Sequence, residues 1–451
     1  MNVKDMKIYE NGLCMNCGTC EGICPSNAIK LVIDEKKGLY KSIVNDKKCT
    51  YCGLCVDCCP GRGVDFKLLN DFLFDKQPKN FWIGNYNGIY IGHASDMDIR
   101  FNSSSGGLIT ALLIFALEKG LINGAVVTRM KKEKPFEPEV FIARNREEIL
   151  LAAGSKYCPV PTNSILKILF SLEGKYAVVG LPCHIHGIRM VQTRKKILRE
   201  KIPFCLGLMC SNNATFIGTK YYFQQWGINI NEVRTFLFRE PGWIKNYNFR
   251  IIMKNGTKIV IPRSGESTYR MRKLSKKILH NSVYHYDFVI PRCLTCCDHT
   301  AILSDISFGD PRLPDLIKTE TIGKSLIVSR TERGKELLEL AKDNSFIEIT
   351  EEIGVEKFFM AQNVKFKKQF YSRARILKFF RKKIPNYYFD KDYGFIRNRY
   401  LNILLYLPSY FTHHRWSWPF LPFFRLIRYY VLKISALSKA FYRKLQKWSK
   451  V

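Results

Sequence analysis

The sequence CMNCGTCEGICP at residues 14–25 is followed by CTYCGLCVDCCP at residues 49–60. Both stretches have the spacing C-x2-C-x2-C-x3-C-P. Cysteines at this spacing, in two runs close together, are typical of a small domain that holds two 4Fe-4S clusters. The two runs therefore decide the fold of the first part of the chain and indicate that it carries single electrons.

In the bacterial-type ferredoxin pattern, the fourth cysteine of each run binds the other cluster. We expect one cluster to be bound by Cys14, Cys17, Cys20 and Cys59. We expect the other to be bound by Cys49, Cys52, Cys55 and Cys24. Cys58 falls outside the pattern and should bind neither.

Zinc sites and disulfides are the two alternatives. Paired C-x2-C units also bind zinc, but zinc signatures usually separate the two pairs by a longer loop. Disulfides need an oxidising compartment and usually a secretory signal, whereas residues 1–10 are charged and contain no apolar run. We therefore expect iron-sulfur clusters in a cytoplasmic protein.

Length and charge suggest more than one unit. The chain has 451 residues, which suits two or three domains, and 16 cysteines, of which the two runs use only half. Its formal net charge of +33 suggests an acidic partner. Residues 361–451 contain 21 Lys or Arg against two acids, so over half of the excess charge lies in the last fifth of the chain.

Beyond a linker expected at Lys67–Ile83, apolar β-branched runs alternate with helical patterns. Strands are expected near 88–92, 124–128, 176–180 and 202–209, with helices between them, as in an α/β layered domain. Further strands are expected near 233–239 and 247–253, the second leading through the hairpin turn Lys254–Thr257 into 258–262. A helix near 214–226 should begin at a Ser211 cap.

Four cysteines of this region could form a third site. Cys183 and Cys210 each follow an expected strand, so both should lie at the carboxyl edge of a parallel sheet. Cys293 and Cys296 supply two more thiols at C-x2-C spacing. The alternative is that these are buried apolar residues, which is our expectation for Cys158, Cys205 and Cys297. For His184 and His186 we expect hydrogen-bonded roles rather than metal ligation.

A possible anion site precedes the helix expected at Leu108–Lys119. The segment Asn102–Gly107 places serines and glycines at the helix N-terminus, where backbone N-H groups can bind the diphosphate of a dinucleotide. An ordinary serine cap with a tightly packed glycine is equally compatible with this segment.

Five segments, in order, carry a family resemblance: Ser103–Gly107, Ala153–Tyr157, Val179–Cys183, Cys293–Cys296 and Ser304–Asp310. Together they resemble the coenzyme F420 hydrogenase/dehydrogenase beta-subunit family over roughly residues 86–352. With the cysteine-rich unit ahead of it, the chain looks like the fused form of this family. Ser211, His184 and Ser304 stand where the family commonly has other residues.

The resemblance implies an oxidoreductase that is either an F420-type dehydrogenase or a ferredoxin-dependent reductase. It implies FAD at Ser104, Ser105, Gly106, Gly107, Ser155 and Lys156, with Lys156 contacting FAD or substrate charge. It also favours a third 4Fe-4S cluster on Cys183, Cys210, Cys293 and Cys296, and leaves the catalytic residues unknown. The implied partners are coenzyme F420 or another two-electron substrate, and a ferredoxin or partner redox enzyme.

Several roles are compatible with the basic tail at residues 361–451. Its apolar runs, Tyr400–Phe411 and Trp416–Leu432, are too short to span a membrane. Basic residues among aromatic ones suit a helix at an anionic membrane surface, which would place the protein at the inner face of the membrane. The tail could instead pack on the domain or bind an acidic partner. No nucleic-acid-binding motif accompanies it.

The predicted architecture is α+β/α/β. A bacterial-type ferredoxin domain at 1–70 is followed by a mixed α/β flavin domain at 86–360 and by a helical basic tail at 361–451. Within the flavin domain we expect an N-terminal part at about 86–160 and a C-terminal part at about 161–352. The alternative function is a ferredoxin-type electron carrier or docking subunit for another redox enzyme, for example in surface-polysaccharide biosynthesis.

Overall fold

The computed structural model describes residues 8–242, 248–261, 287–379, 381–393, 415–421 and 423–424. The statements that follow concern these residues.

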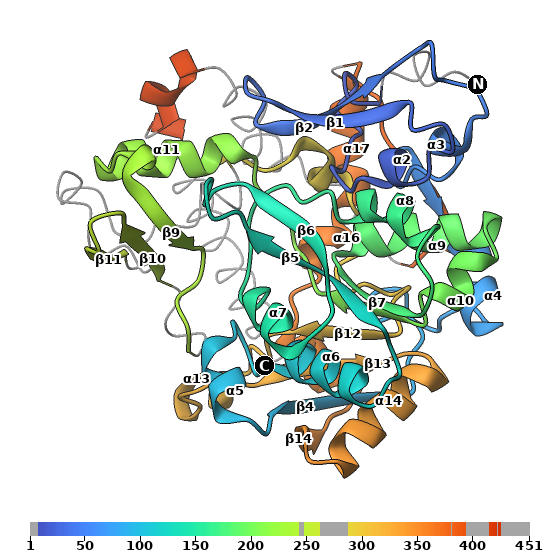
Figure 1. Cartoon of the computed structure of the whole chain (residues 1–451). Helices are drawn as coiled ribbons and strands as arrows, with labels where there is room; N and C mark the ends of the chain where they lie inside the picture. The colour runs from blue at the N-terminus through green and yellow to red at the C-terminus, as the bar shows by residue number, and fades with distance from the viewer. Residues whose placement is uncertain are drawn as a thin grey trace, which may run out of the picture.

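A mixed eight-stranded sheet forms the centre of the molecule (Figure 1). Its strands, in spatial order, are β14 (Ile347–Glu352), β4 (Gly88–Ala94), β13 (Ser325–Ser329), β12 (Ile306–Gly309), β8 (Phe204–Leu208), β7 (Tyr176–Gly180), β5 (Gly124–Met130) and β6 (Pro138–Ala143). The four strands β12, β8, β7 and β5 are parallel, and the pairs outside them are antiparallel. The α/β layering expected from the sequence is thus confirmed.

Helices cover both faces of the sheet because its central strands are apolar on both sides. Ala125 and Val127 pack into the core beneath one set of helices, whereas Val126 between them faces the other core. The first face is covered by α6 (Leu108–Glu118), α7 (Arg146–Leu151) and α14 (Glu332–Asp343). The second is covered by α8 (Leu166–Leu169), α9 (Pro182–Arg194), α10 (Ile197–Lys201) and α15 (Val355–Ala361).

The cysteine-rich unit is built around a two-stranded antiparallel sheet. It contains α2 (Thr19–Gly22), β1 (Ile29–Asp34), β2 (Leu39–Val44), α3 (Leu54–Asp57) and β3 (Gly63–Asp65). The unit packs directly on the 3-10 helix η1 (Thr162–Ile165) and on α8. At Gly22 the two backbones approach so closely that a Cβ atom would overlap the carbonyl of Asn163.

The prediction of a linker at Lys67–Ile83 was wrong for its first half. Most of that half is the helix α4 (Phe66–Phe74). Asp65 caps this helix by accepting a hydrogen bond from the Leu68 N-H, at 2.9 Å. Phe66 and Leu69 are buried in the main core. Lys67 and Asp71, two of the charges that suggested a linker, lie on the exposed side of this amphipathic helix.

A smaller antiparallel sheet lies at the side of the molecule. It consists of β9 (Val233–Leu237), β10 (Phe249–Met253) and β11 (Lys258–Ile261), and the predicted hairpin turn at 254–257 is confirmed. The helix α11 (Phe216–Trp226) packs beside this sheet and follows Thr215 rather than the expected Ser211 cap. Shorter elements are α5 (Met97–Asn102), η2 (Ile230–Glu232), η5 (Pro291–Thr295) and α13 (Pro314–Thr319).

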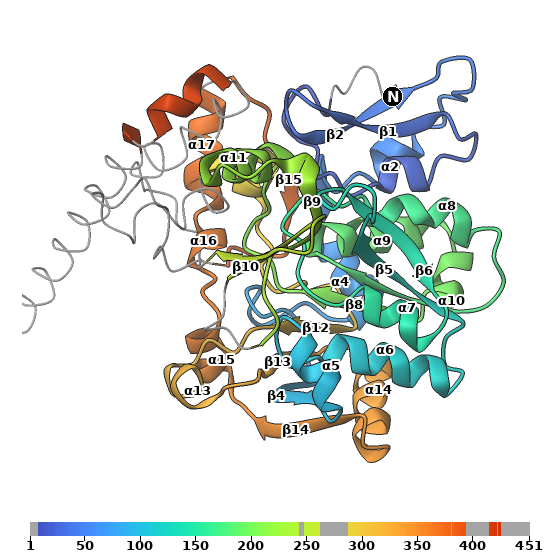
Figure 2. The same cartoon turned by 60° about the vertical axis from the view of Figure 1, so that its left-hand side comes forward.

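The first part of the C-terminal extension is integrated into the fold. It forms α16 (Lys365–Lys368), α17 (Phe370–Phe379) and β15 (Asn386–Tyr388), and β15 pairs in parallel with β3 of the cysteine-rich unit. Figure 2 shows α17 and α16 one above the other along one side of the molecule. The expected helical tail is therefore only partly helical where it is described.

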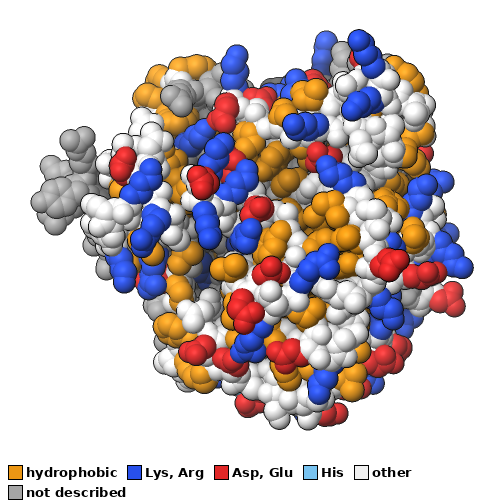
Figure 3. All heavy atoms as spheres, viewed as in Figure 1, with side chains coloured by type: hydrophobic (Ala, Val, Ile, Leu, Met, Phe, Trp, Pro, Cys, Tyr) orange, Lys and Arg blue, Asp and Glu red, His pale blue; other side chains and the backbone are white. Residues whose placement is uncertain are grey.

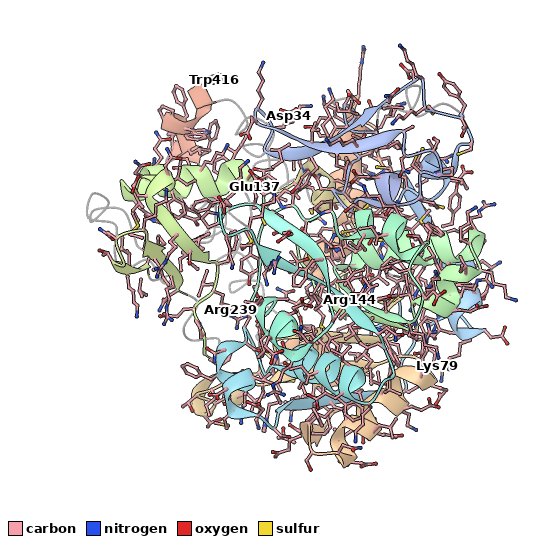
Figure 4. All side chains as sticks on the ribbon, in the orientation of Figure 1. Asp34, Lys79, Glu137, Arg144, Arg239 and Trp416 are labelled. Atoms are coloured by element: carbon pink, nitrogen blue, oxygen red, sulfur yellow. The ribbon has the colours of Figure 1, made fainter. Side chains whose placement is uncertain are left out.

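A second described piece of the extension is the 3-10 helix η7 (Arg415–Phe420). Trp418 is buried against Tyr221 of α11, with ring centroids 5.2 Å apart, whereas Trp416 at the outer edge of the molecule is exposed (Figure 4). The run Tyr400–Phe411 and most of the run Trp416–Leu432 lie outside the described residues. No helix among the described residues is both long enough and apolar enough to cross a membrane.

The buried carboxylate of Asp305 connects β8 with helices on both faces of the sheet. Asp305 accepts hydrogen bonds from Arg189 of α9 at 2.8 Å, from Arg333 of α14 at 2.6 Å and from the Cys205 N-H at 2.7 Å. Burial raises the pKa of Asp305, but the two guanidinium groups outweigh it and hold the pKa below its ordinary value. Asp305 thus joins helices on opposite faces of the sheet.

We expect Asp305→Asn to lower the free energy of unfolding by about 3–5 kcal/mol, because it leaves the Arg189 guanidinium buried without its counter-charge. The measurement is the apparent melting temperature from circular dichroism under anaerobic conditions. Asp343→Asn, at the exposed end of α14, is the control and should change the stability by less than about 0.5 kcal/mol. Equal melting temperatures for the two variants would contradict this role of Asp305.

Candidate functional site

The first cysteine group is assembled from both sequence runs. Cys14, Cys17 and Cys20 lie around the start of α2, and Cys59 follows α3. Burial raises the pKa of Cys20 well above its ordinary value, and the charges of the other three thiols and of Cys55 raise it further. The structure therefore brings together the four residues expected to bind the first cluster.

The second cysteine group shows the same crossing. Cys24, Cys49, Cys52 and Cys55 line one cavity. Burial raises the pKa of Cys55 to about 12, with added contributions from the other three thiols. Cys52 and its neighbour Tyr51 are exposed, so this group lies at the surface.

Cys58 lies apart from both groups. It is 1% exposed, belongs to the core beneath α9, and its Sγ lies 3.7 Å from the carbonyl oxygen of Met190. No three His, Cys, Asp or Glu side chains in the described parts of the chain are gathered tightly enough to surround a single metal ion. Four cysteines line one cavity in the second group, and four line another cavity within the main domain.

The third cysteine group is also brought together. Cys183 lies in the first turn of α9 after β7, Cys210 follows β8, and Cys293 and Cys296 flank the end of η5. All four line one cavity. Burial raises the pKa of Cys183 well above its ordinary value, and the charges of Cys17 and of its three partners add to the effect.

One residue of this cavity was missed by the sequence analysis. Lys367 of α16 lines the cavity and is 1% exposed. Burial lowers its pKa, but the charges of the Cys296, Cys210 and Cys293 thiolates outweigh it and raise the pKa above the ordinary value. Nothing in the sequence distinguishes this lysine from the other basic residues of the extension.

The two histidines near Cys183 have hydrogen-bonded roles, as expected. His184 Nε2 lies 3.0 Å from the Val160 carbonyl oxygen, and its Nδ1 accepts from the Leu181 N-H at 3.1 Å. His186 Nε2 lies 2.9 Å from the Asp298 carboxylate. Cys158, Cys205 and Cys297 are buried, also as expected.

The three cysteine groups form a series. Cys17 of the first group and Cys183 and Cys296 of the third belong to one buried cluster with Met15. At its other side the first group adjoins the second, since the charge of Cys55 affects the pKa of Cys20. The order is therefore third group, first group, second group, from the interior of the main domain to the surface.

A buried arginine fastens the first group to the third. Arg292, next to Cys293, donates to the carbonyl oxygens of Gly61 at 2.9 Å and Pro60 at 3.2 Å, directly after Cys59. It also donates to the hydroxyl of Tyr387 in β15 at 2.8 Å. One guanidinium thus joins the cysteine-rich unit, the main domain and the C-terminal extension.

The two loops expected to hold FAD meet in the structure. The Ser155 N-H donates to Ser104 Oγ at 2.8 Å, at the N-terminal end of α6. Ser105 Oγ donates to the Lys324 carbonyl at 2.6 Å, and the Gly106 N-H donates to Ser325 Oγ at 2.9 Å. Ser105 and Gly106 therefore hold the start of β13 in place.

Gly107 and Lys156 have different positions at this site. Gly107 begins α6 with a φ of 77°, and no side chain caps this helix. The Lys156 ammonium donates to the carbonyl oxygens of Ala152, Ala153 and Gly154 at 2.5–3.0 Å. Burial lowers the pKa of Lys156 to about 8. The Lys156 ammonium thus stabilises the backbone of the loop that follows α7.

The loop that contains Ser155 and Lys156 lies close in sequence to the third cavity. Pro159, three residues beyond Lys156, and the following Val160 form part of the wall of this cavity. The Asn213 amide fixes this segment by donating to the Cys158 carbonyl at 2.6 Å. A group bound at the two loops would therefore be near the third cavity.

Family comparisons agree with this organisation. A 4Fe-4S dicluster domain model matches residues 13–62. Models of the N-terminal and C-terminal parts of the coenzyme F420 hydrogenase/dehydrogenase beta subunit match residues 89–167 and 173–354, together more than half of the chain. The protein is an iron-sulfur oxidoreductase. It belongs to the coenzyme F420 hydrogenase/dehydrogenase beta-subunit family.

Individual relatives are distant. The chain is 25% identical over 407 residues to a coenzyme F420-dependent sulfite reductase of Methanocaldococcus jannaschii, covering 87% of this chain and 55% of the relative. It is 26% identical over 272 residues to a coenzyme F420 hydrogenase subunit beta of Methanothermobacter thermautotrophicus, covering 59% of this chain and 85% of that subunit. The chain thus spans little more than half of the sulfite reductase.

A solved structure shares the fold. A chain of the F420-reducing [NiFe] hydrogenase complex from Methanosarcina barkeri aligns with a TM-score of 0.51 and 23% identity. The alignment covers 68% of this chain and 98% of that chain.

We expect Cys59→Ala to remove one 4Fe-4S cluster, about four irons, because Cys59 completes the first cysteine group. Cys58→Ala is the matched control at the adjacent position, and it should retain all the iron because its side chain points into the core. The measurement is the iron and sulfide content after anaerobic purification. Equal loss in both variants would contradict the assignment of Cys59.

Proposed function

We propose that the chain exchanges a hydride between an organic partner, coenzyme F420 or a similar molecule, and FAD, and that single electrons then pass through three 4Fe-4S clusters. The observation that carries this proposal is the continuity of the cysteine groups. Four thiols from three separate segments line the third cavity, and Cys183 of that cavity lies beside Cys17 of the first group.

The donor sets suit the proposed clusters. Each of the three groups offers four thiols, which are the ligands that 4Fe-4S clusters take from proteins. In the third cavity Cys183 and Cys296 are buried and Cys210 and Cys293 are partly buried, whereas in the second group Cys52 is exposed. This arrangement allows electrons to travel between a protected site and an exposed one.

The meeting of the two loops supports the proposed FAD site. Ser104 and Ser155 are joined by a hydrogen bond, and a Cβ atom built on Gly154 would meet only Ser104 Oγ, at 4.0 Å. The glycine therefore leaves space above the loop. FAD, when bound there, supplies the conversion between a two-electron hydride and single electrons. The chain's part is to place the flavin beside the third cavity, through the short segment from Lys156 to Pro159.

Support for F420 as the organic partner comes from the relatives, whose names include coenzyme F420 hydrogenase and sulfite reductase. The exposure of Cys52 and Tyr51 supports electron exchange with a ferredoxin or a partner redox enzyme at the second cysteine group. On the face shown in Figure 3, Lys and Arg side chains are interspersed with Asp and Glu side chains. A membrane role of the tail concerns residues mostly outside those described.

The second candidate is a ferredoxin-type carrier whose main domain docks it on another redox enzyme. The observation that favours it is the surface position of the second cysteine group, which needs no flavin to exchange electrons. It differs from the leading proposal in cofactor content.

Cofactor content and reduction test the leading proposal. Anaerobically purified protein should contain about twelve irons and about one FAD per chain. Reduced F420 should bleach the visible absorbance of the clusters. Eight irons without flavin would instead establish the carrier function. A full cofactor content with no bleaching by reduced F420 would mean that another two-electron partner is used.

The contribution of the two loops can be tested at neighbouring serines. We expect Ser104→Ala to weaken FAD binding about tenfold, because it removes the hydroxyl that joins the loops. Ser103→Ala is the control, since Ser103 Oγ is buried and bonded to the Ile99 carbonyl within α5. FAD affinity is measured by fluorescence during reconstitution. An unchanged affinity in Ser104→Ala would place the flavin elsewhere.

A further inference from the structure

Lys367 lies outside the regions that match the family models, which end at residue 354. It belongs to α16 of the C-terminal extension, yet it lines the cavity of Cys183, Cys210, Cys293 and Cys296. Its side chain is almost fully buried. Burying an ammonium group is costly unless a negative charge balances it, so we expect a negative charge beside Lys367.

The charged groups of the cavity show which anion that is. Among the described residues that line it, only Lys367 and Asp298 carry a full charge in their ordinary state. The Asp298 carboxylate is engaged by His186 and by the N-H groups of Thr300 and Ile302, at 2.9–3.1 Å. Lys367 shares this cavity with Cys183, Cys210, Cys293 and Cys296, so its charge acts on the negative charge that these four side chains carry as thiolates or as cluster ligands.

The second cysteine group provides a comparison within the same chain. Its cavity is lined by four cysteines as well, but none of the described residues around it is charged apart from the thiols themselves. The buried lysine thus distinguishes the third cavity from the second.

The extension holds α16 firmly in this place. The following helix α17 packs on η5, which carries Cys293, and β15 pairs with β3 of the cysteine-rich unit. Arg292 connects these parts through Tyr387. A residue on α16 is therefore kept at a fixed distance from the third cavity.

We propose that Lys367 is a positioning residue that sets the reduction potential of the third cluster, and that the C-terminal extension serves to place this charge. The inference rests on the third cluster put forward under the proposed function. Reduction adds one negative charge to a cluster, so a fixed cation beside it stabilises the reduced form and raises the potential. Removing the cation lowers the potential without removing a ligand.

The test compares Lys367→Met with Lys368→Met. Lys368 is the next residue of the same helix, but it is only half-buried and its ammonium lies 5.3 Å from the ring centroid of Trp82. The potentials are measured on the full chain by redox titration monitored by electron paramagnetic resonance. We expect Lys367→Met to reduce the ratio of reduced to oxidised third cluster about tenfold at a fixed potential, a shift of about −59 mV for one electron. Lys368→Met should match the wild type.

Three outcomes are informative. If Lys367→Met retains about twelve irons and the wild-type potentials, the inference is overturned while the third cluster stands. If the wild type itself contains only eight irons, the third cluster fails and the inference fails with it. If Lys367→Met cannot hold the third cluster, Lys367→Arg decides. Retention of the cluster near its wild-type potential by the arginine variant supports a requirement for charge, and loss of the cluster overturns it.

Discussion

The contact between the cysteine-rich unit and the main domain is the constraint on which the other features depend. Asn163 makes this contact: its N-H donates to the Cys17 carbonyl at 2.8 Å, and its side-chain amide donates to Thr19 at 2.9 Å and to the His184 carbonyl at 2.8 Å. These bonds place the first cysteine group next to Cys183. Without this contact the two sets of thiols would be separate sites rather than a series.

Charge balance is the second organising feature. Twelve thiols in three groups would carry a large negative charge as cluster ligands, and burial raises the pKa of many of them, including Cys14 and Cys210 to about 12. Metal binding must therefore displace protons from these thiols. The interior supplies buried cations at the same places, with Arg292 between the first and third groups and Lys367 in the third cavity. If clusters occupy these groups as proposed, the same two side chains affect both the stability of the sites and their redox chemistry.

Much of the fold could be predicted because it is encoded locally. The apolar run of β7 and the hairpin turn before β11 depend on a few adjacent residues, and both were confirmed. The helix α4 was not predicted because it is short and its apolar stripe, which includes Phe66 and Leu69, is narrow and lies among charged residues. The pairing of β15 with β3 joins residues more than three hundred positions apart, and neither strand shows a signal for the other.

The sequence by itself determined the cysteine spacing. Because this spacing matches the bacterial-type ferredoxin pattern, it predicted two four-cysteine ligand sets that exchange their fourth cysteine. It also indicated that Cys183 and Cys210 could meet, since strand ends share one edge of a parallel sheet, and that Cys293 and Cys296 could join them as a C-x2-C pair. Only the tertiary structure decided the order of the three groups and the choice of Lys367 among 21 basic residues of residues 361–451. Long-range packing decides both features. The effect of a charge on a nearby group depends on their distance and on burial, and the local sequence encodes neither.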